Sequence, residues 1–107
     1  MNRSDRLMLA TALATALGTA HAADPAKLVT QYGCAACHAV DKKLVGPSWK
    51  DVATRYRGNA GAPALLAERV RKGSTGVWGQ VPMAPVDAKT LADADLKALI
   101  SWVLKTP

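Results

Sequence analysis

Two cysteines and a histidine fall within five consecutive residues of this chain of 107 residues, as Cys34-Ala35-Ala36-Cys37-His38. Two thiols separated by one helical turn can each add to one of the two vinyl groups on a porphyrin edge. An imidazole on the next residue then faces the iron, and C-x-x-C-H is the attachment pattern of a c-type haem. The sequence therefore predicts one haem c, held by Cys34 and Cys37 and ligated by His38.

A second iron ligand is expected from the later part of the chain. Met83 is the only methionine after Met8, and a thioether sulfur is a soft donor that can complete the coordination of haem iron. A lone methionine usually fills a gap in a core. Met83 differs because it lies in the stiff run Pro82-Met83-Ala84-Pro85, so we predict that it is the sixth ligand.

The first 22 residues have the pattern of a secretory signal peptide. Arg3 and Arg6 precede an apolar stretch, Leu7–Gly18, and Ala20-His21-Ala22 is a small-residue cleavage site. The apolar stretch has 12 residues, fewer than the about 20 that a membrane-spanning helix needs. We therefore expect cleavage rather than an uncleaved anchor, no stable membrane insertion afterwards, and a periplasmic protein with one small domain over residues 23–107.

Other uses of the cysteines fit the sequence less well. In an oxidising compartment two cysteines usually suggest a disulfide, and a thioredoxin-like redox pair is the main alternative. That interpretation expects strands alternating with helices around the motif, but the chain has almost no strand pattern. A zinc site lacks a fourth ligand, because no second Cys/His cluster accompanies the motif.

The charge of the chain is moderately positive. Its 14 Lys and Arg against 8 Asp and Glu give a formal net charge of +6, which becomes +5 without Arg3, Arg6 and Asp5. Such a charge is compatible with steering toward acidic partner proteins or an anionic membrane, and equally with an ordinary solvated surface. The basic residues are scattered and accompany no binding motif, so we expect no nucleic-acid partner.

Two helices are predicted around the motif. The first begins at Asp24-Pro25, an N-cap followed by proline, and runs to Gly33. The second begins at Ser48, which forms a capping pair with Asp51. Its apolar face carries Trp49, Val52 and Tyr56.

Two further helices are predicted in the second half of the chain. One runs from Pro63 to Gly73, with Leu66, Arg69 and Val70 on one face. The last is capped by Thr90 and Asp93 and has the strongest periodicity in the chain. Its apolar positions are Leu96, Leu99, Ile100, Val103 and Leu104. The intervening segment, Gly73–Pro85, is too rich in glycine and proline for a regular helix.

This ordered set of motifs resembles the class I c-type cytochromes, specifically the small bacterial single-haem cytochromes of the c-551/c-552 kind. The resemblance covers nearly all of residues 23–107. It rests on G-C-A-A-C-H at 33–38, V-G-P at 45–47, K-D-V-A at 50–53, G-S-T-G-V-W-G at 73–79, V-P-M-A-P at 81–85 and W-V-L at 102–104. It implies an all-α fold of four to five short helices around one haem, with the first and last helices crossing.

The resemblance also implies roles for individual residues. It makes Cys34 and Cys37 the thioether residues and His38 and Met83 the axial ligands. It implies that the Pro47 carbonyl accepts a hydrogen bond from the far nitrogen of His38, which fixes the tautomer and the ring orientation.

For the haem propionates, the resemblance implies hydrogen bonds from Trp78 and Arg69. A carboxylate in a low-dielectric site needs donors and a positive partner. Core packing is the alternative role of Trp78, and a surface charge is the alternative for Arg69. Well-known members of the family read P-M-P-P-N in the ligand segment, where the Asn side chain reaches the methionine sulfur. Here Val86 stands at that position and cannot donate this bond.

The predicted function is that of a monomeric one-electron carrier, not an enzyme. Ligation by His and Met raises the reduction potential and leaves no open iron position for a substrate. Redox partners would dock weakly and transiently at a partly exposed haem edge, with Lys42, Lys43, Arg71 and Lys72 as candidate contributors. The resemblance suggests a quinol-oxidising complex as donor, and a haem nitrite reductase, terminal oxidase or cytochrome c peroxidase as acceptor.

Two alternatives remain open at this stage. One is a gas-binding or peroxidatic haem protein in which Met83 dissociates and O₂, NO or peroxide takes its place. The other is a thiol oxidoreductase without haem.

Overall fold

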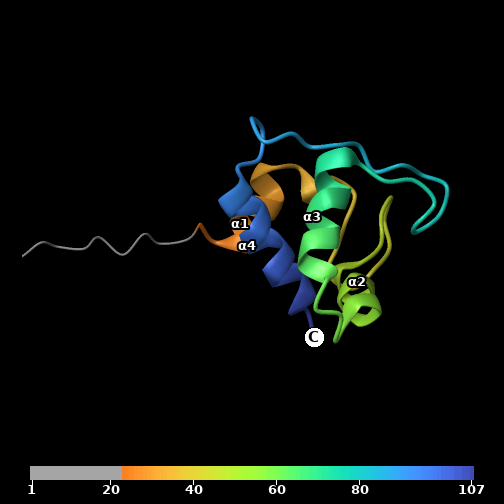
Figure 1. Cartoon of the computed structure of the whole chain (residues 1–107). Coiled ribbons are helices and arrows are strands. Elements are labelled where there is room, and N and C mark those ends of the chain that lie inside the picture. Colours follow the sequence, from red (N-terminus) through yellow and green to blue (C-terminus); the bar gives the residue numbers. More distant parts are fainter. Residues whose placement is uncertain (1–22) are drawn as a thin grey trace, which may run out of the picture.

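The computed structural model describes residues 23–107, and the predicted signal peptide lies outside the described residues. The helices are α1 (Pro25–Gln31), the short 3-10 helix η1 (Cys34–Ala36), α2 (Trp49–Tyr56), α3 (Ala62–Lys72) and α4 (Asp93–Leu104) (Figure 1). Residues 23–107 hold no strand, only isolated bridges. The predicted all-α class is confirmed, and no helix in this part of the chain is both long and apolar enough to cross a bilayer.

The first two long helices begin where the sequence predicts. The Asp24 side chain accepts a hydrogen bond from the Ala26 backbone N–H at 3.1 Å, with Pro25 at the first helical position. The Ser48 hydroxyl accepts one from the Asp51 N–H at 3.0 Å. Both contacts satisfy N–H groups that a helix start leaves without a partner.

The last helix begins later than predicted. Its N-cap is Ala92, with no side-chain cap, so the predicted cap by Thr90 and Asp93 is wrong. The Asp87 carboxylate accepts the Thr90 N–H at 2.8 Å, and this hydrogen bond holds the pKa of Asp87 below its usual value. Asp87 therefore organises a turn at this point, while the Asp93 carboxylate binds Arg71 instead.

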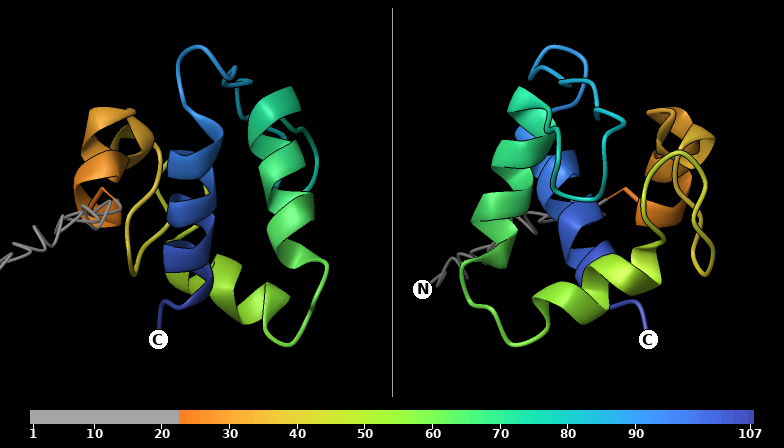
Figure 2. Two further views of the ribbon diagram at one scale, coloured as in Figure 1. Left: turned by 60° about the vertical axis from the view of Figure 1, so that its left-hand side comes forward. Right: turned by 90° about the vertical axis from the view of Figure 1, so that its right-hand side faces the viewer.

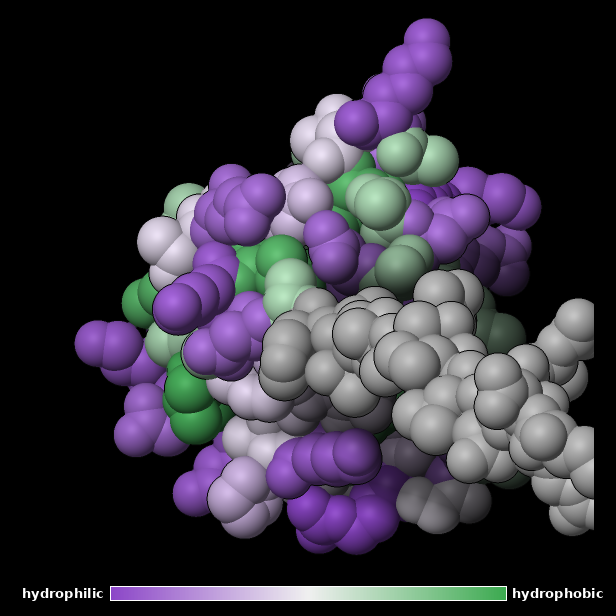
Figure 3. Space-filling view, turned by 90° about the vertical axis from the view of Figure 1, so that its left-hand side faces the viewer, coloured by the Kyte–Doolittle hydropathy of each residue, from purple (hydrophilic) through white to green (hydrophobic). Residues whose placement is uncertain are grey.

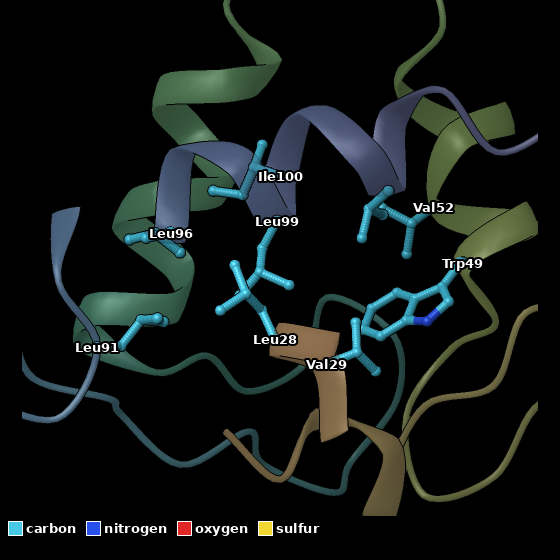
Figure 4. Packing of buried hydrophobic residues seen from close by; sticks show 9 residues of the cluster. Leu28, Val29, Trp49, Val52, Leu91, Leu96, Leu99 and Ile100 are labelled. Atoms are coloured by element: carbon cyan, nitrogen blue, oxygen red, sulfur yellow. The ribbon is translucent and has the colours of Figure 1, made fainter. Parts of the chain in front are cut away.

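The helix α4 is the centre of the molecule. It contacts α1, α2 and α3, and Figure 2 shows it between α1 and α3. The buried cluster comprises Leu28, Val29, Trp49, Val52, Leu91, Leu96, Leu99, Ile100 and Val103. In Figure 4, Leu28 of α1 points toward Leu99 of α4, and Trp49 lies beside Val29. The apolar face predicted for the last helix is thus the one that forms the core.

A polar contact fixes the end of the first helix on the last. The Tyr32 hydroxyl donates to the Asp95 carboxylate at 3.0 Å. Figure 3 shows the face on the side of α1 and α4, where the visible described residues are mostly hydrophilic and apolar areas are small and scattered. On this face, the visible described residues therefore expose little apolar surface.

Candidate functional site

The C-x-x-C-H motif forms a tight turn at the end of α1. The backbone N–H groups of Cys37 and His38 both donate to the Cys34 carbonyl, at 3.2 and 3.0 Å. Both cysteines are free thiols, with Cys34 half-buried and Cys37 exposed. Burial raises the pKa of the Cys34 thiol, whereas reactive redox cysteines have a lowered pKa. The raised pKa of the Cys34 thiol and the lack of strands in residues 23–107 both disfavour the thioredoxin-like alternative.

The imidazole of His38 is held on two sides. Its Nδ1 lies 2.7 Å from the Pro47 carbonyl oxygen, the contact that the resemblance implies. A carbonyl only accepts, so Nδ1 carries the proton and Nε2 keeps the lone pair that a metal needs. The ring also stacks on the Trp49 indole, with centroids 4.3 Å apart and planes at 20°. The His38 ring is therefore held in one orientation, with the Nε2 lone pair free to form a ligand bond.

Gly46 is required beside this imidazole. A Cβ at this position would lie 2.5 Å from Cε1 and 3.1 Å from Nε2 of His38. The Gly46 N–H also donates to the Cys37 carbonyl at 2.7 Å, which holds the segment before α2 against the motif.

We expect Gly46→Ala to destabilise the protein by about 1–3 kcal/mol, the usual effect of overpacking, because either His38 or the Gly46 backbone must move. Denaturant unfolding of the protein with its cofactor measures this. Gly61→Ala is the matched control, since a Cβ there meets only the Asn59 side chain at 3.4 Å. Equal stability of Gly46→Ala and Gly61→Ala would contradict the close packing described here.

Met83 lies in a segment that is paired with the end of α3. Its N–H donates to the Ser74 carbonyl at 2.8 Å, and the Ser74 N–H donates back to the Met83 carbonyl at 3.1 Å. Gly73 has a φ of +74°, and a Cβ there would lie 2.7 Å from the Met83 carbonyl oxygen. The glycine after α3 therefore permits both the turn and the close approach of this segment.

One cavity of about 390 Å³ joins these segments, within the about 300–1,000 Å³ typical of ligand and cofactor sites. All seven predicted site residues line it: Cys34, Cys37, His38, Pro47, Arg69, Trp78 and Met83. Apolar side chains from α1, α2, α3 and α4 make up most of the remaining wall, among them Val29, Val52, Leu66, Val70, Leu96 and Leu99. In the right-hand view of Figure 2, the teal segment after α3 lies nearer α3 and the yellow segment before α2 lies nearer α1; residues of both segments line the cavity.

Arg69 and Trp78 supply polar groups to the cavity wall. Both are half-buried, and within residues 23–107 the Arg69 guanidinium makes no hydrogen bond or ion pair with the protein. A partly buried cation without a protein partner suits an anionic group of a ligand. The donor set thus fits haem c: two thiols, an imidazole, a thioether, an apolar enclosure and a cation.

The motif residues do not form a zinc site in the described part of the chain. Among the described residues, no three His, Cys, Asp or Glu side chains come together as a metal would require. The three candidate ligands of the motif are therefore not arranged as a zinc centre.

Sequence reasoning missed two supporting residues. The Arg55 guanidinium lies 4.4 Å from the centroid of the Trp78 ring, and its Nη1 donates to the Val77 carbonyl at 2.9 Å. Trp49, assigned only to the apolar face of α2, also stacks on His38. No periodic pattern in the sequence links Arg55 to Val77, which lies 22 residues later. The position of Trp49, two residues after the V-G-P motif, could have indicated a contact with the site.

Comparison with known proteins gives the family. The sequence pattern described as cytochrome c matches residues 22–107. The chain is 55% identical over 85 residues to cytochrome c2 of Rubrivivax gelatinosus, covering 79% of this chain and 100% of the relative. It is 48% identical over 97 residues to cytochrome c-551 of Pseudomonas aeruginosa, covering 91% of this chain and 89% of the relative.

A solved structure agrees with the sequence relatives. The crystal structure of Nitrosomonas europaea cytochrome c552 is similar to this chain with a TM-score of 0.71 and 44% sequence identity, covering 77% of this chain and 99% of that one. The resemblance to class I bacterial cytochromes is thereby confirmed, in sequence and in fold. The chain belongs to the cytochrome c family, whose members bind haem c covalently and serve in electron transport.

Proposed function

We propose that the protein is a periplasmic monohaem cytochrome that carries one electron at a time between redox partner proteins and is not itself an enzyme. The observation that carries this proposal is the meeting of Cys34, Cys37, His38 and Met83 at one largely apolar cavity. Cys34 and Cys37 would hold haem c as thioethers, with His38 and Met83 as iron ligands. Bound haem supplies a reversible one-electron couple.

The residues around the haem site would set its reduction potential. Pro47 keeps the proton on Nδ1 of His38, which makes the imidazole a better donor through Nε2. The apolar side chains of the cavity wall would limit access of water to a bound haem and would favour the less charged, reduced state of its iron. Arg69 and Trp78 would face a propionate, and the Arg55 guanidinium lies over the Trp78 ring.

A carrier role, rather than gas binding or peroxidase activity, is supported by the restraint on Met83. A displaceable ligand needs a segment that can move, but Met83 is fixed to Ser74 by two backbone hydrogen bonds and lies against Gly73. If His38 and Met83 both ligate the iron, no iron position would remain for a substrate.

A potentiometric titration tests the proposed function. We expect a single one-electron wave for one haem per chain, and rapid electron exchange with a redox partner protein. Turnover of peroxide, or binding of a gas to the unmodified reduced protein, would instead support the peroxidatic or gas-binding alternative.

The proposed partner surface lies at the rim of the cavity. Val45 and Val81 both line the cavity and are 52% and 64% exposed, and Lys42 and Lys43 are exposed just before Val45. A small apolar rim with a few charges suits weak, transient electron-transfer encounters. We infer a monomer that meets a quinol-oxidising complex as donor and a haem nitrite reductase, oxidase or peroxidase as acceptor.

Two of the four basic residues predicted for this surface are engaged elsewhere. Arg71 binds Asp93 and the Val86 carbonyl, and Lys72 pairs with Glu68 at 3.0 Å. Lys42 and Lys43 therefore remain as the better candidates.

Electron transfer to an acidic partner should slow several-fold as ionic strength rises to physiological values, because exposed charges are screened over about 8–10 Å. Stopped-flow kinetics measures this rate. The double variant Lys42→Gln/Lys43→Gln should lower both the rate and its salt dependence, whereas Lys89→Gln/Lys97→Gln, with the same loss of charge, should change both less. A rate that stays flat or increases with salt would indicate apolar docking instead.

A further inference from the structure

The chain segment after Met83 is held by contacts with the end of α3. The Val86 N–H donates to the Val70 carbonyl at 2.9 Å, and Nη1 of Arg71 donates to the Val86 carbonyl at 3.2 Å. Two consecutive residues of α3 thus bind both backbone groups of Val86. This residue stands at the position where relatives with the P-M-P-P-N pattern have the Asn that reaches the methionine sulfur.

The Arg71 side chain is itself well anchored. Its Nη2 binds the carboxylate of Asp93, the first residue of α4, at 2.5 Å. Only 21% of the Arg71 side chain is exposed, and the rigid guanidinium presents separate donors to the two acceptors. Arg71 therefore links α3, the start of α4 and the segment that carries Met83.

The two contacts of Arg71 differ in importance. The Asp93 side chain is 89% exposed, and ion pairs of that kind contribute little to stability. The contact with Val86 is partly buried, and its acceptor is a carbonyl of the segment that carries Met83, so this contact bears directly on where that segment lies. Its loss would also leave the Val86 carbonyl without a partner.

The segment from Met83 to Val86 is therefore fixed at both of its ends. Ser74 pairs with the backbone of Met83, and Val70 and Arg71 bind the backbone of Val86. Between these points, a Cβ on Gly73 would lie 3.1 Å from the Pro85 nitrogen, so the segment lies directly against the end of α3.

We propose that Arg71 is a positioning residue for Met83: by fixing the Val86 carbonyl, it restrains the ligand segment in place of the Asn side chain that this chain lacks. The inference rests on the proposed function, because it takes Met83 to be an iron ligand. It assigns to Arg71 a role in ligand retention rather than in partner docking.

The test is the rate at which imidazole displaces Met83 in the oxidised protein with its haem. Arg71→Met keeps the apolar part of the side chain and removes its donors, so we expect displacement about tenfold faster, the factor that one lost hydrogen bond gives. Asp93→Asn keeps the Val86 contact and should stay within about twofold of wild type, as expected for an exposed pair. Lys72→Met is the matched control, because it loses the same charge on the next residue.

Amide hydrogen exchange of Val86 gives a second readout, which does not depend on the haem spectrum. It should speed up in Arg71→Met and stay unchanged in Lys72→Met. If Arg71→Met does not fold, Arg71→Gln, which is shorter and uncharged, carries the same expectations.

The outcomes separate the inference from the proposed function. If the oxidised wild type lacks the charge-transfer band of a methionine–iron bond, the proposed function fails. If that band is present but imidazole displaces Met83 from the Arg71 variant at the wild-type rate, the inference on Arg71 is overturned. Equal acceleration in Lys72→Met would also overturn it, since charge rather than the Val86 contact would then be responsible.

Discussion

Replacement of Met83 by alanine is expected to leave the haem attached while opening the sixth position of the iron. In the proposed arrangement, Cys34 and Cys37 would hold the haem and His38 would bind its iron, and none of these bonds would need Met83. The loss of the thioether should abolish the methionine–iron band of the oxidised protein completely. The reduced variant should then bind CO, which the wild type should not do.

Absorption spectra with and without CO measure this effect. Val81→Ala is a suitable control, because it removes an exposed side chain from the same segment and from the rim of the same cavity. Unchanged low-spin spectra of Met83→Ala, with no CO binding on reduction, would show that Met83 is not the ligand.

The double variant Cys34→Ala/Cys37→Ala should fail to accumulate as a stable protein. The cavity of about 390 Å³ lies among the apolar faces of the helices. Without haem, these apolar faces would lose the contacts that fill the site, and unfilled apolar space in a core is destabilising. Native domains are stable by only about 5–15 kcal/mol, so we expect the fold to depend on retaining its haem.

The measurement is the periplasmic yield of the variant, followed by circular dichroism of any protein recovered. Each single cysteine variant keeps one thioether and should give an intermediate yield. Ala35→Ser is the control, because it changes an exposed residue of the motif and keeps the C-x-x-C-H pattern. A double variant that accumulates fully folded without haem would refute the claim that haem completes the core.

Local sequence patterns predicted most of the fold. The capping residues Asp24 and Ser48 act within three residues of their partners, and the periodic apolar face of α4 is the core face. The residues of the site could be predicted from C-x-x-C-H and from family motifs, since these lie in short, recognisable runs.

Contacts between distant segments could not be predicted in this way. Arg71 reaches Val86 and Asp93, which are 15 and 22 residues later, and Arg55 reaches Val77 over 22 residues. The start of the last helix was predicted wrongly for the same reason. Its predicted cap relied on Asp93, but that carboxylate binds a side chain from α3, and Thr90 is drawn into the turn organised by Asp87.

The most direct test of the central claim is to record absorption spectra of the purified exported protein, oxidised and reduced, together with its intact mass. The account predicts one haem that stays attached after denaturation, low-spin iron in both states, and a methionine–iron band in the oxidised state. A mass without haem and two titratable thiols would contradict haem attachment at Cys34 and Cys37. A high-spin spectrum with ready CO binding in the unmodified protein would contradict ligation by Met83.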